Sequence, residues 1–242
     1  MAQARSNADA STAVARVDSS SRPKCTSCLF KPQCLPAGLD GEALLAFERA
    51  LSRQAHPVRA GQAVVRQGDA VRALYALRVG VLKATILTDD GGERVAGFRS
   101  PGTVIGLAEP QGGHWTRTFV ALRDSWLCHI PLESLNEAVE RQLVKLMAER
   151  LRREYDCQLA LAFKDRAGKL ADFLLDISES QRRQRLSPHH FTLAMPYADI
   201  ASYLGMRGES VCRALADLRR RGLIEYRGRR FAIPSLEALR AI

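Results

Sequence analysis

Three of the six cysteines stand close together near the start of the chain. Cys25, Cys28 and Cys34 follow the spacing C-x2-C-x5-C, in an irregular stretch punctuated by prolines. Such a backbone can wrap so that three sulfurs converge, and thiolates at this spacing suit either zinc or an iron-sulfur cluster. A fourth ligand must come from elsewhere in the chain.

The other cysteines are isolated in the sequence. Cys128 lies in the segment SWLCHIP and is the candidate fourth ligand, although a lone cysteine there is ordinarily a small buried hydrophobe. We interpret Cys157 and Cys212 as ordinary thiols. The residues alone do not separate zinc from a cluster, and a thiol-disulfide switch stays open as well.

The C-x2-C pair also occurs in disulfide oxidoreductases, which makes a redox enzyme a remote alternative. In those enzymes the pair opens a helix that follows a strand, whereas here it follows a tail rich in Ala, Ser and Arg. We therefore expect no enzymatic activity and name no catalytic residue.

A second pattern with chemical meaning begins at Pro196. The segment YADIASYLG (197–205) predicts a short helix that ends at a glycine turn, and a second helix is expected from about Gly208. Val211, Leu215 and Leu218 form the buried stripe of that second helix. The opposite face carries four side chains placed to reach base edges in a major groove: Glu209, Ser210, Cys212 and Arg213.

These side chains have the chemistry for reading a G·C pair. Arg213 can donate two hydrogen bonds to guanine, and Glu209 can accept one from cytosine. The alternative is a surface ion pair between positions i and i+4. The following segment LIEYRGRRFAI predicts a basic two-stranded wing, and arginines of the region are candidates for phosphate contacts: Arg207, Arg219, Arg220, Arg227, Arg229 and Arg230.

The charge balance favours a polyanionic partner. The chain of 242 residues carries 36 Lys and Arg against 26 Asp and Glu, a formal net charge of +10. From Lys164 onward, 15 basic residues stand against 9 acidic ones, so the anion-binding surface is expected in the last third. Neither a membrane-length apolar run nor a secretory signal is present, so we expect a cytoplasmic protein whose cysteines are ligands or free thiols.

The elements that must position these groups follow from the apolar patterns. Residues 1–24 lack large apolar side chains and are expected to be a disordered tail. Gly41 to Leu51 shows helical spacing. Short β-type runs at 63–65, 73–77, 81–87 and 118–122, with a hairpin turn at Asp90-Gly91-Gly92, predict a β-roll or barrel within a domain at 25–131.

One long amphipathic helix is predicted over Leu132 to Phe163, a stretch without Gly or Pro. Its stripe includes Leu143, Met147 and Leu151. Since no antiparallel partner of that length is evident, we expect this helix to form a homodimer, with packing on its own domain as the alternative. A further helix is expected at 169–180, and residues 164–242 are the predicted DNA-binding domain.

The order of these parts resembles the superfamily of the cyclic-AMP receptor and the fumarate-nitrate reduction regulator. The resemblance begins near residue 22 and rests on the cysteine spacing followed by Leu35-Pro36, on LCHIP, and on DIASYLGMRGESVCRAL. It implies an α+β fold in which an N-terminal β-roll of the cyclic-nucleotide-binding, jelly-roll type is joined by a long dimerisation helix to a C-terminal winged helix-turn-helix.

The resemblance is closest to the oxygen-sensing branch of that superfamily. It implies a [4Fe-4S] cluster on Cys25, Cys28, Cys34 and Cys128, which oxygen converts or destroys. The cluster-bound dimer would bind a palindromic TTGAT-like site in double-stranded DNA and regulate anaerobic genes through RNA polymerase, with activation expected although the residues do not separate activation from repression. Asp156 falls where the family carries an acidic residue whose like-charge repulsion keeps the cluster-free form monomeric.

Two departures from the superfamily pattern matter. Relatives that bind cyclic nucleotides have a Gly-Glu and an Arg-Ser pair, whereas this chain has Leu107 after Gly106 and Thr118 after Arg117, so no cyclic nucleotide is expected. The oxygen regulators carry serine between the base-reading Glu and Arg, where this chain has Cys212. Selection of the outer thymine of the half-site is therefore open.

Overall fold

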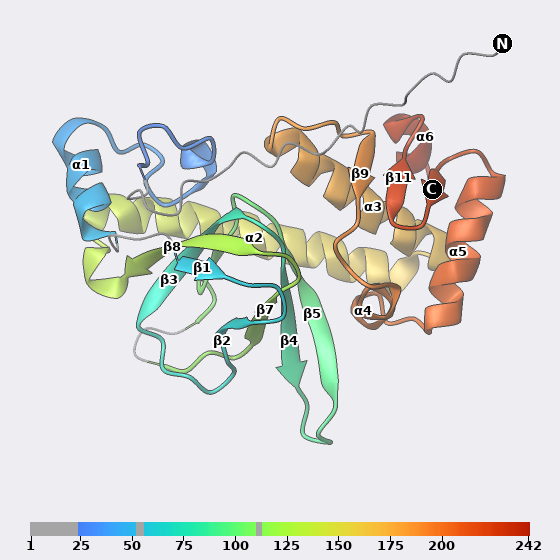
Figure 1. Cartoon of the computed structure of the whole chain (residues 1–242), viewed down its shortest axis with the longest axis horizontal. Coiled ribbons are helices and arrows are strands. Elements are labelled where there is room, and N and C mark those ends of the chain that lie inside the picture. Colours follow the sequence, from blue (N-terminus) through green and yellow to red (C-terminus); the bar gives the residue numbers. More distant parts are fainter. Residues whose placement is uncertain (1–23, 52–55, 110–112) are drawn as a thin grey trace, which may run out of the picture.

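The computed structural model describes residues 24–51, 56–109 and 113–242. All of the predicted tail except Lys24 lies outside these residues. Figure 1 shows the cysteine segment and a short helix at one end, a group of C-terminal helices and strands at the other, and one long helix running between them past a β-domain.

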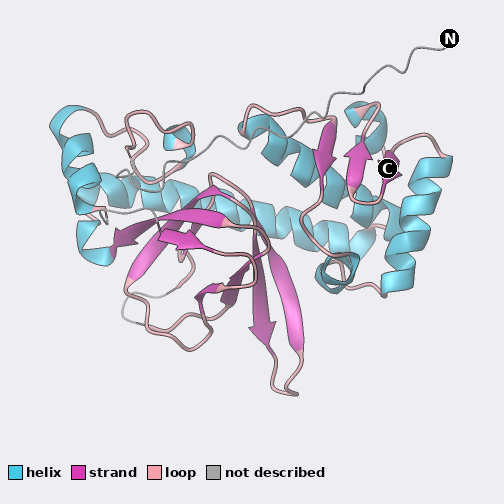
Figure 2. Cartoon of the chain, in the orientation of Figure 1, coloured by secondary structure: helices cyan, strands magenta, loops and turns pink. Residues whose placement is uncertain are grey.

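The β-domain consists of two antiparallel four-stranded sheets, coloured as strands in Figure 2. One sheet has the order β1-β8-β3-β6 and the other β2-β7-β4-β5. Their bounds are β1 (His56–Val58), β2 (Ala63–Val65), β3 (Ala73–Val79), β4 (Leu82–Leu87), β5 (Glu93–Arg99), β6 (Val104–Ile105), β7 (Thr118–Ala121) and β8 (Ser125–Pro131). Apolar side chains such as Leu77, Leu82, Trp115 and Leu127 fill the space between the sheets. The predicted β-roll is confirmed.

The predicted hairpin turn joins β4 to β5. Gly91 has a φ of +78°, which a glycine adopts without steric cost, and the Thr88 amide donates to the Gly92 carbonyl at 2.8 Å. This turn sets the register that pairs β4 with β5, and β5 forms the edge of its sheet.

The cysteine segment contains a 3₁₀ turn, η1 (Lys31–Gln33), and leads into α1 (Gly41–Ala50). The expected helix at 41–51 is confirmed to within one residue. Leu44 and Phe47 of α1 are buried together with Leu35 and Leu39, so the segment packs down as a small apolar layer on the roll.

The long helix α2 (Glu137–Phe163) begins later than the sequence suggests. Residues Leu132–Ser134 form a separate 3₁₀ turn, η2, and the Asn136 side chain caps α2 by accepting the Val139 amide at 3.1 Å. The first turns pack on their own domain through Val139, Leu143 and Leu146. The prediction that Leu143 belongs to an unpartnered stripe is therefore corrected, and the packing alternative holds for this part of α2.

The C-terminal part is built on α3 (Arg166–Arg183), which extends beyond the expected helix at both ends. Its first turn begins at Arg166 because Asp165 caps the helix by accepting the Gly168 amide at 2.8 Å. It continues with β9 (His190–Thr192), α4 (Tyr197–Tyr203), α5 (Gly208–Arg220), β10 (Glu225–Arg227), β11 (Arg230–Ala232) and α6 (Leu236–Arg240). The predicted inward residues Ile200, Val211, Leu215 and Leu218 lie in its core. None of the described helices is long and apolar enough to cross a membrane.

Candidate metal centre and nucleic-acid interface

The cysteine segment is a chain of short turns. The Cys28 amide donates to the Cys25 carbonyl at 3.2 Å, the Lys31 amide to the Cys28 carbonyl at 3.1 Å, and the Cys34 amide to the Lys31 carbonyl at 3.1 Å. Each of these bonds joins residues i and i+3 and closes a turn of four residues, so the backbone curls through successive turns between the three cysteines.

Contacts to α1 and to the roll fix this curl in place. The Thr26 amide donates to the Glu48 carboxylate at 2.8 Å, and the Lys31 ammonium donates to the Leu39 carbonyl at 2.8 Å. On the roll side, a Cβ at Gly102 would lie 2.9 Å from a ring carbon of Phe30. A glycine is required there because its φ is +89° and because the cysteine segment approaches this turn between β5 and β6 so closely.

All four predicted ligands line one small, almost wholly apolar cavity. Cys25, Cys28 and Cys34 come from the N-terminal segment, whereas Cys128 lies in β8, where it pairs with Ala76 of β3. The remaining wall includes Phe47, Leu51, Leu77, Arg78 and Ile130. All four cysteines are free thiols, and the cavity is lined by cysteines from two distant parts of the sequence.

Burial governs the acidity of these thiols. It raises the pKa of Cys25 to about 12 and that of Cys128 to about 11, and it raises the pKa of Cys34 further. Repulsion between the thiolates adds to the effect, while the guanidinium of Arg78 opposes it at Cys25 and Cys128. Thiols in this state are protonated at neutral pH and are poor nucleophiles, which is unlike the low-pKa cysteine of a disulfide oxidoreductase.

Four cysteines are the donor set of a tetrahedral zinc ion as well as of an iron-sulfur cluster. Four thiolates that share a tetrahedral ion at about 2.3 Å would stand roughly 3.8 Å from one another. Within the described residues, no three or more His, Cys, Asp or Glu side chains are gathered to hold a single ion. Four cysteines that line one cavity supply the number and type of ligand that a cubic iron-sulfur cluster takes.

The exposed face of α5 presents the predicted base-reading side chains. Glu209, Cys212 and Arg213 are exposed and Ser210 is partly exposed, whereas Val211, Ala214 and Leu215 are buried beneath them. Arg213 donates to Glu209 at 3.1 Å, and their side chains are 74% and 83% exposed. An exposed pair of this kind contributes only tenths of a kcal/mol, so it exchanges readily for contacts to bases.

The arginines around α5 divide into two groups. Arg219 lies over the ring of Tyr226 at 5.6 Å, Arg220 pairs with Asp217, and Arg229 donates to the Ala194 carbonyl at 3.4 Å. These three are anchored to the fold. Arg207 precedes α5 as its N-cap residue, and Arg227 and Arg230 flank the turn between β10 and β11, all three being exposed.

The later part of α2 exposes an apolar stripe. Its members are Val144, Met147, Leu151, Tyr155, Leu159 and Phe163, each between 44% and 84% exposed. They recur at steps of three and four and so lie on one face of the helix. Asp156, also exposed, lies at the edge of this stripe next to Tyr155.

Comparisons with known proteins agree with this arrangement. A model of the cyclic nucleotide-binding domain matches residues 55–142, and a model of the Crp-like helix-turn-helix domain matches residues 168–242. The chain belongs to the CRP/FNR family. The second match takes in α4, α5 and the three-stranded sheet β10-β11-β9, so the helix-turn-helix inferred from the sequence is confirmed.

Similar proteins carry the name that the sequence suggests. The chain is 29% identical over 224 residues to the fumarate and nitrate reduction regulatory protein of Salmonella typhimurium, covering 90% of this chain and 89% of that protein. It is equally similar, over 221 residues, to the protein of that name from Escherichia coli K12. The resemblance to this group of regulators is confirmed, and the chain is a DNA-binding transcription regulator of the family.

Solved structures support the fold. FixK2 from Bradyrhizobium japonicum aligns with a TM-score of 0.69 and 25% identity, covering 79% of this chain and 96% of the other. A CRP-family transcriptional regulator from Thermus thermophilus aligns with a TM-score of 0.64 at 22% identity, over 77% of this chain and 95% of that regulator. The predicted combination of β-roll and winged helix-turn-helix is confirmed.

Sequence reasoning overlooked one residue of the cysteine cavity. Arg78 on β3 lines the cavity and is the guanidinium that lowers the pKa of two of its thiols. Arg78 lies in the run ALYALRV, and an arginine in such a strand is ordinarily interpreted as facing solvent. Only the folding of the cysteine segment over this strand gives it a place beside the thiols.

Proposed function

We propose that the protein regulates transcription in response to oxygen through a [4Fe-4S] cluster held by Cys25, Cys28, Cys34 and Cys128. In this proposal residues 25–131 form the sensor domain, 132–163 the dimerisation segment and 164–242 the DNA-binding domain. The cluster-bound dimer binds a palindromic TTGAT-like site and regulates anaerobic genes together with RNA polymerase. The observation that carries the proposal is the convergence of four cysteines on one apolar cavity.

The packing around the cavity provides a route from the sensor to the dimer helix. Cys25 and Cys128 belong to the same apolar cluster as Val139 of α2, and Leu143 and Leu146 pack against that cluster. A change at the cysteines that loosens the N-terminal segment therefore removes packing from the first turns of α2. The exposed stripe on the following turns is the surface that a second copy of the chain would cover.

The bound cluster supplies the reactivity toward dioxygen. The protein supplies four thiolates, an apolar wall that limits access of water, and the positive charge of Arg78 beside the anionic ligands. Since burial raises the pKa of Cys25, Cys34 and Cys128 and keeps these thiols protonated, loading of iron releases protons from them. Asp156, at the edge of the exposed stripe, would oppose dimerisation until the packing of α2 outweighs the repulsion.

An alternative keeps the DNA binding and replaces the cluster with a zinc site or a thiol-disulfide switch. Zinc would require the four sulfurs to move together onto one ion. A thiol switch would require cysteines that ionise near neutral pH, whereas burial raises the pKa of three of these four. A redox enzyme based on the C-x2-C pair is disfavoured by the same acidity and by the regulator domains of the chain.

The deciding measurement is the content of iron, acid-labile sulfide and zinc in protein purified without oxygen, with the visible spectrum followed as air is admitted. We expect about four irons and four sulfides per chain, as the cluster formula requires, and loss of colour in air. A colourless protein that carries zinc or no metal would overturn the cluster proposal and leave the DNA-binding assignment in place.

A further inference from the structure

The wall of the cysteine cavity contains two basic side chains. Among the described residues that line it, Lys31 and Arg78 are the cations, and neither Asp nor Glu is present. Glu48 of α1 is close enough to raise the pKa of Cys25, but it lies outside the lining, where its carboxylate accepts the Thr26 amide at 2.8 Å. The wall of the cavity is therefore positively charged.

Arg78 stands at an irregularity of its strand. The pairing of β3 with β8 shifts between Leu77 and Val79, which leaves Arg78 as an extra residue without a partner on β8. Bulges of this kind re-aim a side chain and are common beside functional sites. Here Arg78 lines the cavity together with Ala76, which pairs with Cys128. The strand thus presents a guanidinium and a proposed ligand to the same cavity.

The guanidinium of Arg78 has no protein partner among the described residues. No ion pair there includes Arg78, and its side chain forms no hydrogen bond with them. The Lys31 ammonium, by contrast, donates to the Leu39 carbonyl at 2.8 Å. Because a guanidinium only donates hydrogen bonds, the N–H groups of Arg78 are available to an anionic acceptor.

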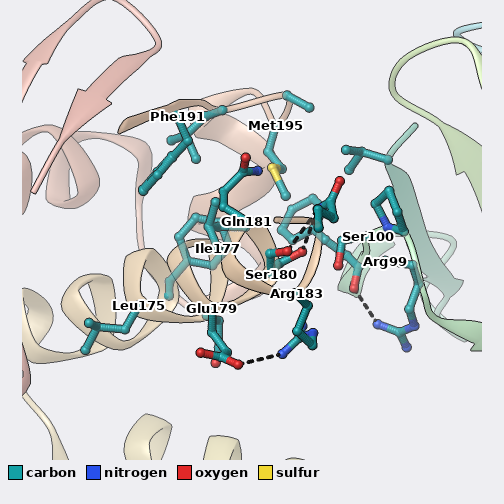
Figure 3. Close-up of a pocket in the computed structure, with 18 of the residues that line it drawn as sticks. Arg99, Ser100, Leu175, Ile177, Glu179, Ser180, Gln181, Arg183, Phe191 and Met195 are labelled. Atoms are coloured by element: carbon teal, nitrogen blue, oxygen red, sulfur yellow. Dashed lines mark hydrogen bonds and ion pairs between the residues drawn. The ribbon is translucent and has the colours of Figure 1, made fainter. Parts of the chain in front are cut away.

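Arg78 lies where the cysteine cavity meets a large cleft. Cys28, Phe30 and Arg78 line both the cavity and the cleft, which extends between the roll, α2 and the C-terminal domain. Figure 3 shows a further part of this cleft, with Arg99 and Ser100 on the roll side. Since Arg78 is only half-buried at this mouth, its guanidinium keeps part of its hydration, and its charge costs less than that of a fully buried one.

A metal group held by the four cysteines would be anionic. Four thiolates around a divalent ion, or around a cluster core of the same charge, leave a net charge of about −2. Enclosing this charge in an apolar cavity is costly unless positive charge stands beside it. The two basic side chains of the wall match it in sign and in number. The guanidinium of Arg78 also lowers the pKa of Cys25 and Cys128, as a charge that acts on these sulfurs must.

We propose that Arg78, with Lys31, provides the counter-charge of the metal–thiolate group on the four cysteines, and that retention of the metal depends on Arg78. This inference rests on the proposed function and adds a residue that the bound group requires. Arg78 is a positioning residue, because it acts through the sulfur ligands and does not itself bind the metal. Lys31 also holds the Leu39 carbonyl, so Arg78 is the residue whose charge can be tested by itself.

The test compares the full-length wild type with Arg78→Met and Arg78→Lys, all loaded and handled without oxygen. Methionine removes the charge and keeps an unbranched side chain, whereas lysine keeps the charge. Arg72→Met is the matched control, because Arg72 is an exposed arginine of the neighbouring sequence that does not line the cavity. Iron and acid-labile sulfide are measured first. The rate at which iron passes to an excess of a chromogenic ferrous chelator is measured next.

We expect iron release about tenfold faster from Arg78→Met than from the wild type, since residues that support metal ligands have effects of this size. Arg78→Lys and Arg72→Met should release iron at nearly the wild-type rate. Because Arg78 has no protein partner, the metal-free forms of the wild type and Arg78→Met should melt at the same temperature. A merely structural role of Arg78 would lower the melting temperature of the metal-free variant and would not require a positive charge.

The outcomes separate this inference from the cluster proposal. Equal iron release by the wild type and Arg78→Met, or release from Arg78→Lys as fast as from Arg78→Met, would overturn the role of Arg78 and leave the cluster in place. If the wild type holds zinc without iron and sulfide, the cluster proposal fails, and release of zinc to a chelator tests Arg78 with the same variants. A wild type that holds no metal would overturn both.

Discussion

The Lys83 ammonium lies 3.2 Å from each carboxylate oxygen of Asp199 and thereby joins β4 of the sensor to α4 of the helix-turn-helix. Both side chains are only 18% exposed. Alongside them the Val95 amide of the edge strand β5 donates to the Ser202 hydroxyl at 3.0 Å. The sensor therefore holds the first helix of the DNA-binding motif directly, in addition to the covalent connection through α2 and α3.

Breaking this ion pair should weaken the contact between the sensor and the DNA-binding domain. Asp199→Asn leaves the partly buried Lys83 with only the exposed Glu93 carboxylate at 3.9 Å as a counter-charge. We expect a loss of about 1 to 3 kcal/mol in the free energy of unfolding, between the values for exposed and buried pairs. Denaturant unfolding of Asp199→Asn, Lys83→Met and the double variant measures the coupling. Arg182→Gln, which breaks an exposed pair with Glu179, should cost less than about 1 kcal/mol. A coupling energy near zero for Lys83 and Asp199 would contradict the expectation.

The base-reading role of Arg213 predicts a change in specificity. Arg213→Ala should cost about 1 to 3 kcal/mol of binding free energy on a TTGAT-like site and little on random DNA, because the bidentate contact to guanine is lost while phosphate contacts stay. Fluorescence anisotropy at fixed salt with both DNA duplexes measures this. Arg230→Ala is the matched control, since an exposed wing arginine should weaken binding to both duplexes alike. Equal losses for Arg213→Ala on both duplexes would show that it contacts phosphate only.

The periodicity of apolar residues predicted many of the helices and strands. It missed strands that form only because they pair with another strand of the fold. The run AVV at 63–65 is β2, and the two helices of the helix-turn-helix lie within two residues of their expected positions. Strand β5 escaped notice because ERVAGFR carries a glycine and charged ends, and it becomes a strand by pairing with β4. β9 has only three residues, HFT, and exists because β11 pairs with it.

The cysteine site likewise depends on contacts between residues that are far apart in the sequence. The spacing of the first three cysteines predicts that they bind one group, whereas Cys128 reaches the same cavity only because β8 pairs with β3 and the N-terminal segment folds over that pair. Lys83 and Asp199 are 116 residues apart, and no local pattern connects them. Contacts of this kind follow from the tertiary fold and leave no periodic signal in the sequence.

Mutation can distinguish the proposed ligand cysteines from the cysteines that lie outside the cavity. Cys28→Ala should abolish iron binding and with it the difference in DNA binding between anaerobic and air-exposed protein, since three thiolates would remain at the cavity. Cys157→Ala is the control, because Cys157 lies on α2 away from the cavity, where its sulfur is 3.2 Å from the Tyr203 hydroxyl. Iron content and anaerobic DNA binding are the readouts. Survival of the oxygen response in Cys28→Ala would remove this cysteine from the ligand set.

The exposed stripe of α2 makes a prediction about assembly. Leu151 is 54% exposed in the single chain and would be covered in a dimer, so Leu151→Ser should weaken self-association while leaving the fold of the chain intact. Asp156→Ala should act in the opposite direction and strengthen dimerisation of the cluster-free protein, because it removes repulsion at the edge of the stripe. Arg152→Ser changes an exposed neighbour on α2 and should have a smaller effect than either. Sedimentation equilibrium over a range of protein concentrations measures all three variants, and a dimer constant unchanged by Leu151→Ser would place the interface elsewhere.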